Sequence, residues 1–100
     1  MALLGGSAIG IDLGSERTRI CLNGGVALSE PTAVLVSSAN AQEVLAVGME
    51  AAALSGRAAG QAELLSPVVA GAVADVDMAA LLIVALTEKA AGRKKMFDKA

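Results

Sequence analysis

The N-terminal segment constrains the fold of this chain most, because it has the pattern of two strands joined by a tight polar turn. Residues 7–13 and 18–22 are largely apolar, and residues 14–17 between them are small or charged. This arrangement is typical of a β-hairpin. Asn23-Gly24-Gly25 is a second turn signal, since Asn and Gly accept the positive φ of tight turns, and residues 26–28 resume a strand. The sequence therefore predicts three successive antiparallel strands.

The first turn carries groups that suit a phosphate and its metal ion. Asp12 lies at the end of the first strand, and Gly14 and Ser15 enter the turn. A carboxylate can hold Mg²⁺ through its water ligands, while a glycine backbone and a serine hydroxyl can face phosphate oxygens. A structural interpretation explains the same residues: Gly10 and Gly14 serve hairpin geometry, and Asp12 is a solvated charge. These residues alone leave both interpretations open.

The middle of the chain predicts a second hairpin followed by a short helix. Residues 32–36 are rich in β-branched side chains, and residues 43–47 form another apolar run after a polar turn. Residues 49–54 have the alanine-rich composition of a short helix that Gly56 ends. Residues 58–61 are expected to be a loop.

The longest predicted element is a helix over residues 77–91. Its apolar residues recur at the i, i+3, i+4, i+7, i+8 spacing of one helix face. They are Met78, Leu81, Leu82, Ala85 and Leu86. Ile83 and Val84 fall outside this stripe, which predicts a helix that is buried on more than one side.

Both ends of this helix carry recognisable signals. Asp75 or Asp77 can cap the first turn, since a side-chain oxygen can accept its unpaired N–H groups. Lys89 and residues 93–95 place cations near the end, where the helix dipole favours them. Gly92 is expected to stop the helix.

Composition excludes several kinds of site from this sequence. Hydrophobic residues make up 55% of the chain and Phe97 is the only aromatic residue, which favours an aliphatic α/β layered core. Histidine is absent and Cys21 is the only cysteine, so no histidine-based triad, disulfide framework or structural zinc site can form. The net charge of −2 gives no general attraction for nucleic acid, and no nucleic-acid partner is expected.

Nothing in the sequence favours secretion or a membrane-spanning helix. The N-terminus lacks the basic start and long apolar stretch of a secretory signal. The apolar stretch over residues 68–86 is interrupted by Asp75 and Asp77, which disfavours a transmembrane span. We therefore expect a cytoplasmic protein.

Five segments, in order, resemble MreB-type bacterial actins. Residues 9–15, Ile-Gly-Ile-Asp-Leu-Gly-Ser, resemble the first phosphate loop of the actin, sugar-kinase and heat-shock-chaperone ATPase superfamily. Residues 25–34 resemble the MreB strand that leads into a Glu-Pro-Ser segment, and residues 44–51 its next strand and helix start. Residues 65–67 and 71–75 resemble its Arg-Pro and Gly-Val-Ile-Ala-Asp stretches. Their order and spacing cover nearly all of the chain.

The resemblance implies the N-terminal part of an actin-like, ribonuclease H-like α/β fold. A mixed sheet of antiparallel strands would be followed by a small hairpin and helix subdomain and a long helix. Residues 1–31 would form the first strands with the phosphate loop, and residues 32–75 a small inserted subdomain. Residues 76–100 would form the return helix and a basic, apolar C-terminal segment.

The resemblance also implies ATP and Mg²⁺ as cofactors. Asp12 would face Mg²⁺ through water, and the loop beneath the phosphates would consist of Gly14, Ser15, Glu16 and Arg17. The family usually has Thr-Ala-Asn at residues 15–17. Ser15 keeps the hydroxyl, whereas Glu16 brings a negative charge near the phosphates and Arg17 introduces a long cation.

The rest of the family's nucleotide site lies in sequence beyond residue 100. That sequence holds the second phosphate loop, the segment that contacts adenosine and the acidic residue that positions the attacking water. We therefore expect these 100 residues alone to bind ATP weakly or not at all and not to hydrolyse it. No catalytic residue is assigned.

The C-terminal segment is a second candidate contact site. Residues 93–99 place Met96 and Phe97 among cations. In the family, a short apolar loop at this place enters the cytoplasmic membrane, and basic neighbours suit anionic headgroups. The alternative is that Met96 and Phe97 cover the end of the helix or begin another core element.

These features lead to three hypotheses. The first is an N-terminal fragment of a cell shape-determining, actin-like cytoskeletal ATPase that forms filaments at the inner face of the membrane. Its partners would be other filament subunits, the membrane surface and the missing C-terminal part of the fold. The second is a fragment of a small-molecule kinase of the same superfamily, against which stand the MreB-like Glu30-Pro31 and residues 71–75. The third is an interaction module without nucleotide chemistry, which the large apolar fraction favours.

Overall fold

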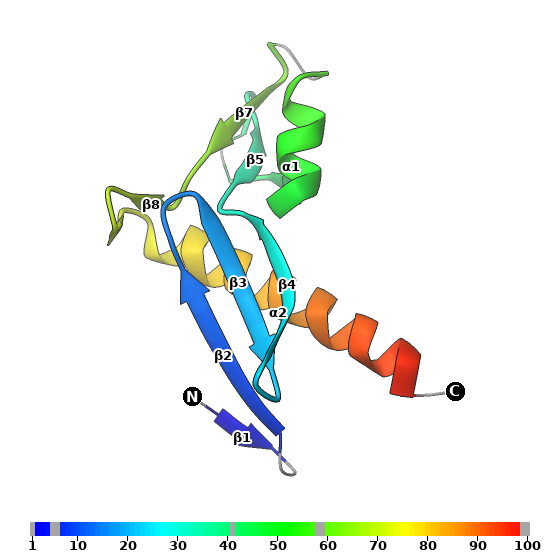
Figure 1. Ribbon diagram of the computed structural model, residues 1–100. Helices are drawn as coiled ribbons and strands as arrows, with labels where there is room; N and C mark the ends of the chain where they lie inside the picture. The colour runs from blue at the N-terminus through cyan, green and yellow to red at the C-terminus, as the bar shows by residue number, and fades with distance from the viewer. Residues whose placement is uncertain (1, 5–6, 41, 58–59, 99–100) are drawn as a thin grey trace.

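The computed structural model shows a four-stranded sheet, a three-stranded sheet and a two-stranded pairing beside one long helix (Figure 1). It describes the backbone of residues 2–4, 7–40, 42–57 and 60–98, and the side chains of residues 8–40, 42–57 and 60–92. None of the helices among these residues is both long and apolar enough to cross a bilayer.

The first sheet is an antiparallel meander of four strands in the order β1-β2-β3-β4. The strands are β1 (Ala2–Leu4), β2 (Ser7–Leu13), β3 (Arg17–Leu22) and β4 (Gly25–Pro31). The three predicted successive strands are confirmed as β2, β3 and β4. Side chains of β3 alternate, with Thr18 and Ile20 buried against the helix side and Arg17 and Arg19 exposed on the other face.

The second sheet has the order β6-β5-β7 and carries a short helix on one face. Its strands are β5 (Val34–Ser37), β6 (Val44–Val47) and β7 (Ala62–Leu65), and the helix is α1 (Gly48–Ser55). The predicted hairpin and short helix are confirmed. Sequence analysis missed β7, which adds to the second edge of β5, and the two-residue strands β8 (Val68–Val69) and β9 (Ala72–Val73), which pair with each other.

The long helix α2 (Val76–Asp98) begins at the predicted cap. The amide of Met78 donates to Asp75 Oδ1 at 3.0 Å, so Asp75 caps the first turn. The predicted stop at Gly92 is wrong, because the helix continues to Asp98. One glycine lowers helix stability by only about 1 kcal/mol relative to alanine, and the good helix formers on both sides outweigh that effect.

The buried face of α2 is rotated from the predicted one. It consists of Ala79, Leu82, Leu86 and Ala90. Leu81, which we placed on the packed face, is 43% exposed, and Val84, which we expected to be buried on a second side, is 56% exposed. The small side chains of Ala79 and Ala90 fit a closely packed helix face. A prediction that places the most hydrophobic residues inside therefore assigns the wrong residues to this face.

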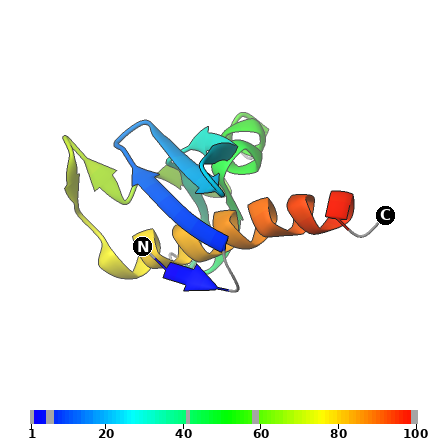
Figure 2. The ribbon, with the colours of Figure 1, turned by 60° about the horizontal axis from the view of Figure 1, so that its bottom comes forward.

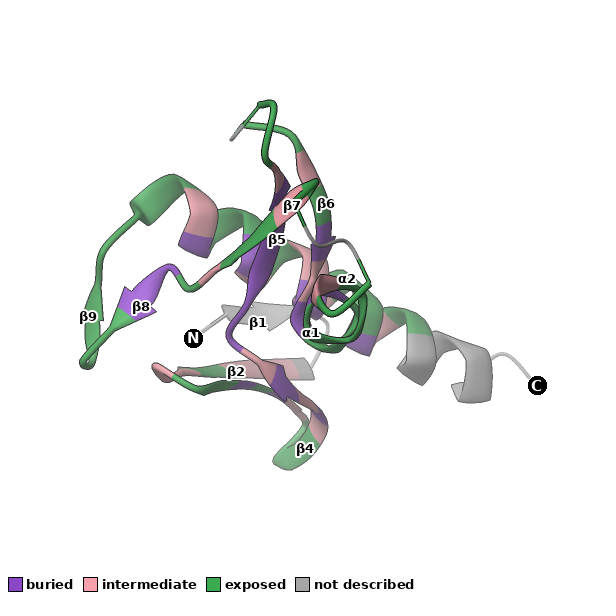
Figure 3. Ribbon diagram, turned by 90° about the horizontal axis from the view of Figure 1, so that it is seen from above, coloured by how far each residue is buried: buried purple, intermediate pink, exposed green. Residues whose placement is uncertain are grey.

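One core joins both sheets to α2 (Figure 3). Its buried members are Ile20, Leu28, Val34, Val36, Leu82, Leu86 and Ala90. A second, smaller cluster lies between α1 and the second sheet and consists of Ala33, Leu35, Ala46 and Ala51. The end of α2 runs past both sheets, as the turned view shows (Figure 2).

Candidate functional site

The β2–β3 turn, residues 14–17, is closed by its own backbone. The Gly14 amide donates to the Arg17 carbonyl at 3.0 Å. A Cβ on Gly14 would lie 3.0 Å from that same carbonyl oxygen, which is tighter than nearly all real contacts. The sequence therefore needs a glycine here for close backbone approach, whatever ligand the turn meets.

The Ser15 side chain is held by a segment far away in the sequence. Its Oγ accepts a hydrogen bond from the Gly71 amide at 2.7 Å, across 56 residues. Gly71 lies in the β8–β9 turn with φ of +81°. A hydroxyl has two acceptor lone pairs and one proton, so Ser15 can accept from Gly71 and still donate to a phosphate oxygen. Sequence analysis did not identify Gly71 as part of this site.

Two buried threonines lie next to the turn and hydrogen-bond to each other. Thr18 Oγ1 and Thr32 Oγ1 lie 2.7 Å apart in a buried hydrogen bond. The Thr32 amide also donates to the Glu16 carbonyl at 2.8 Å, while the Glu16 side chain is exposed. These bonds tie the exit of β4 to the turn, and sequence analysis missed both threonines because each looks like an ordinary strand residue.

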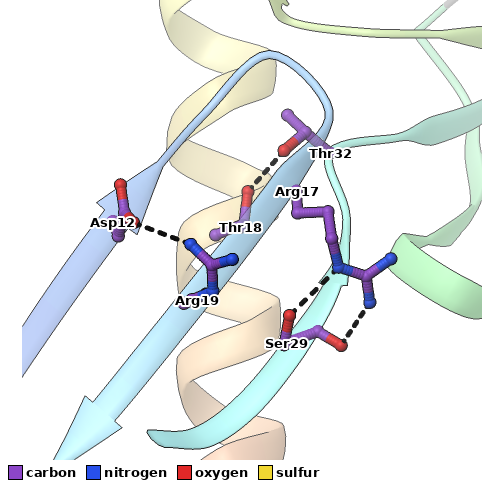
Figure 4. Close-up of polar contacts among 6 residues, drawn as sticks. All are labelled: Asp12, Arg17, Thr18, Arg19, Ser29 and Thr32. Carbon is purple, nitrogen blue, oxygen red and sulfur yellow. Dashed lines mark hydrogen bonds and ion pairs between the residues drawn. The ribbon is translucent and has the colours of Figure 1, made fainter.

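The Arg17 guanidinium lies over β4 (Figure 4). Its Nε donates to Ser29 Oγ at 3.1 Å and its Nη2 to the Ser29 carbonyl at 2.9 Å. The backbone of Arg17 thus belongs to the turn, whereas its charge is directed toward the neighbouring strand. A role of this charge beneath a phosphate stays a prediction.

Asp12 has an arginine beside it that sequence analysis did not assign to the site. Arg19 Nη1 lies 3.2 Å from Asp12 Oδ2, and the two side chains are 50% and 66% exposed. Among the described residues, no group of three or more acidic, histidine or cysteine side chains could hold a metal ion. The expected contact of Asp12 with Mg²⁺ stays a prediction.

The turn is partly open to solvent, and a groove among the described residues lies elsewhere. A groove of about 320 Å³ is lined by Gln42, Val44, Asp75, Asp77, Met78 and Leu81. None of the predicted site residues lines it. The groove is therefore separate from the β2–β3 turn, whose Gly14 and Ser15 are partly exposed and whose Glu16 and Arg17 are exposed.

Comparisons with known proteins identify the family of this arrangement. The family model described as MreB/Mbl protein matches residues 6–100. Cell shape-determining protein Mbl of Bacillus cereus is 39% identical over 71 residues, which are 70% of this chain and 21% of that protein. Mbl of Bacillus subtilis gives the same identity and coverage.

Solved structures of MreB proteins resemble this chain in fold. MreB5 of Spiroplasma citri bound to ADP has a TM-score of 0.69 at 26% identity, over 91% of this chain and 26% of that one. The form of Spiroplasma citri MreB5 bound to AMPPNP has a TM-score of 0.65 at 27% identity, over 77% and 23%. The chain thus spans about a fifth of the Mbl relatives and about a quarter of the solved chains. The actin-like α/β fold and the resemblance found from the sequence motifs are confirmed, and this chain belongs to the MreB/Mbl family.

Proposed function

We propose that this chain supplies the first phosphate-binding turn of an actin-like, cell shape-determining protein. The observation that carries the proposal is the turn itself, in which Gly14 permits close backbone approach and Ser15 is oriented by Gly71. Relatives named as cell shape-determining proteins and MreB5 structures bound to ADP and AMPPNP support the same assignment.

The proposed role of each residue follows from its geometry. The amides of Ser15 and Glu16 and the Ser15 hydroxyl donate to phosphate oxygens, as backbone turns with successive N–H groups do elsewhere, while the Gly14 amide keeps its bond to the Arg17 carbonyl. The Thr18–Thr32 bond and the Gly71 contact fix the turn before a ligand arrives. This fixed geometry lowers the entropy that binding must overcome.

These 100 residues alone are proposed to bind nucleotide weakly and not to hydrolyse it. The turn lies on an open surface, and the chain spans about a quarter of the nucleotide-bound relatives. A ligand that contacts only the β2–β3 turn stays largely exposed to water, whereas small-molecule sites usually bury most of the ligand. The remaining walls would come from the sequence that the longer relatives have beyond this region.

Titration of the ¹⁵N-labelled chain with ATP tests the proposal. Amide shifts are expected at Gly14, Ser15 and Gly71, with an affinity in the millimolar range. Ser15→Ala should weaken the response several-fold and Ser15→Thr should retain it, because threonine keeps the hydroxyl. Ser55→Ala is the matched control, since the Ser55 hydroxyl bonds within α1. Absence of shifts in the turn, or shifts spread evenly over the surface, would overturn the proposal.

We further propose that the whole protein forms filaments at the cytoplasmic membrane. Met96 and Phe97 lie outside the residues whose side chains are described, so their contact with lipid remains a proposal. It is supported by the end of α2, which runs past both sheets and carries basic residues in sequence (Figure 2).

Exposed apolar side chains support the further proposal that additional protein covers this surface. Val76 is 72% exposed, Val69 58% and Val84 56%. Side chains of this kind favour contacts with the part of the fold that the longer relatives have beyond this region or with neighbouring subunits. The interaction-module hypothesis uses the same observation, and the ATP titration distinguishes the two.

Binding to anionic vesicles tests the membrane proposal. The wild-type chain should sediment with phosphatidylglycerol vesicles, and Phe97→Ser should reduce the bound fraction. Val84→Ser is the control for general loss of exposed apolar surface. Equal loss in both variants, or no binding by the wild type, would count against a specific contact by the C-terminal segment.

A further inference from the structure

We propose that Arg19 sets the ionic selectivity of the phosphate turn by keeping divalent cations away from Asp12. Arg19 takes the place beside this carboxylate that a cation would need. If the proposed function holds, Arg19 also supplies the positive charge that a phosphate group meets there. The turn would then select a metal-free phosphate over a metal-bound one.

Strand register fixes Arg19 beside Asp12. The two residues are direct cross-strand partners in the β2–β3 pairing. Such partners have Cα atoms about 4.5–5.5 Å apart, so their side chains start from neighbouring positions on the same face of the sheet. In the structure Arg19 Nη1 reaches Asp12 Oδ2 at 3.2 Å (Figure 4).

The ion pair is exposed, and its strength alone would not exclude a metal ion. Exposed pairs of this kind contribute little to stability, and a stronger ligand can displace them. The excluding effect comes from the position of the charge. A divalent ion held by Asp12 would lie within about 6 Å of the guanidinium, and the repulsion at that distance in water corresponds to roughly tenfold in affinity.

The donor set near Asp12 does not offset this repulsion. Mg²⁺ is usually held by one or two carboxylates together with substrate phosphates and water. Among the described residues, Asp12 is not part of any group of three or more acidic, histidine or cysteine side chains that could hold a metal ion. The single carboxylate that the family resemblance assigns to Mg²⁺ is paired with a cation of the same chain, and this pair makes Asp12 a poor partner for a divalent ion.

The neighbouring arginine provides a matched comparison. Arg17 lies on the same strand and the same exposed face, but its guanidinium donates to the hydroxyl and the carbonyl of Ser29. Figure 4 shows the two guanidinium groups on opposite sides of β3, with Arg19 toward β2 and Arg17 toward β4. Arg17→Leu and Arg19→Leu thus remove equal charge from one strand, and only the second removes the partner of Asp12.

Paramagnetic broadening by Mn²⁺ alone, in spectra of the ¹⁵N-labelled chain, tests the exclusion. The wild type should show no selective loss of the Asp12 and Leu13 amide signals. Arg19→Leu should lose them selectively at a Mn²⁺ concentration roughly tenfold below any effect in the wild type. Arg17→Leu should show a much smaller change, and Arg19→Lys should behave as the wild type because it keeps the charge.

The same spectra report whether each variant is folded. If Arg19→Leu does not fold, Arg19→Gln retains more of the side-chain stem and removes the same charge. Selective broadening in the wild type at the concentration that affects the leucine or glutamine variant would overturn the proposal.

Titration with ATP in EDTA and in Mg²⁺ tests the consequence for phosphate. ATP in EDTA should shift the Gly14 and Ser15 amides at least as readily as ATP with Mg²⁺, and Arg19→Leu should weaken binding in EDTA several-fold. Binding only in the presence of Mg²⁺ would overturn the charge-supplying role of Arg19. No binding in either buffer would contradict the proposed function, while the Mn²⁺ measurement would still decide whether Arg19 excludes cations.

Discussion

Glu30 joins three elements through one buried carboxylate. It is 2% exposed, its Oε1 accepts the Met49 amide at 2.9 Å, and Lys89 Nζ lies 2.6 Å from its Oε2. The first turn of α1 has no side-chain cap from its own N-cap residue, Val47, so the carboxylate of β4 serves that purpose from another element. The same group attaches α2 to the first sheet.

Glu30→Ala should lower the free energy of unfolding by about 2–3 kcal/mol, because it removes a buried acceptor and leaves the Met49 amide without this partner. Urea unfolding followed by circular dichroism gives the value. Glu88→Ala is the control, since Glu88 is exposed and adjacent to Lys89, and its effect should stay within about 0.5 kcal/mol. Equal losses in the free energy of unfolding would show that the contacts of Glu30 do not stabilise the fold.

Gly48 also packs against the Glu30 carboxylate. Its φ is +66°, and a Cβ there would collide with Glu30 Oε1. Gly48→Ala should therefore destabilise the chain by at least about 2 kcal/mol, from backbone strain and from displacement of the carboxylate.

Gly56 is the matched control for Gly48. It has φ of −71°, and open space surrounds its added Cβ. Gly56→Ala should be neutral or stabilising by up to about 1 kcal/mol, since it restricts only the unfolded chain. Thermal unfolding of the two variants measures both effects. Equal changes in stability would contradict the proposed need for glycine at residue 48.

At the residue scale, sequence reasoning identified the turn but not its supports. Asp12, Gly14 and Ser15 form a local pattern that the sequence displays directly. The contacts of Ser15 with Gly71 and of Asp12 with Arg19 depend on which segments the fold brings together and on strand register. No local pattern carries that information, so both partners required the structure.

At the element scale, local signals decided what could be predicted. Turn residues and β-branched runs predicted β2 to β6, and the alanine-rich run predicted α1. The strand β7 contains Glu63 and Leu64, both exposed, and forms because β5 offers an unpaired edge. Its existence depends on a distant partner, so composition gave no indication of it.

The packing face of α2 leads to a direct comparison of two neighbouring leucines. Leu82 is fully buried in the core that joins both sheets, whereas Leu81 is 43% exposed. Leu82→Ala should reduce stability by about 2–4 kcal/mol through lost burial and a residual cavity. Leu81→Ala should cost less than about 1 kcal/mol. Chemical denaturation of both variants measures the difference, and similar losses would mean that α2 packs with the face predicted from the sequence.

At the scale of the whole molecule, the division into residues 1–31, 32–75 and 76–100 remains a prediction, and the core makes it testable. Ile20 and Leu28 of the first sheet, Val34 and Val36 of the second, and Leu82 and Leu86 of α2 form one buried cluster. A shared core of this kind favours a single cooperative transition. The cluster beneath α1 is separate and contains mostly alanines, so it should contribute less stability.

Native-state hydrogen exchange should therefore show two levels of protection. Amides at the centres of β3, β5 and α2 should exchange only through global unfolding, with equal free energies of opening and equal dependence on denaturant. Amides of α1 should open at lower free energy, because in this helix only Gly48 and Ala51 are buried. If β5 and β6 instead opened together with α1 while β3 and α2 stayed protected, residues 32–75 would be an independent subdomain and the shared core would not be the unit of stability.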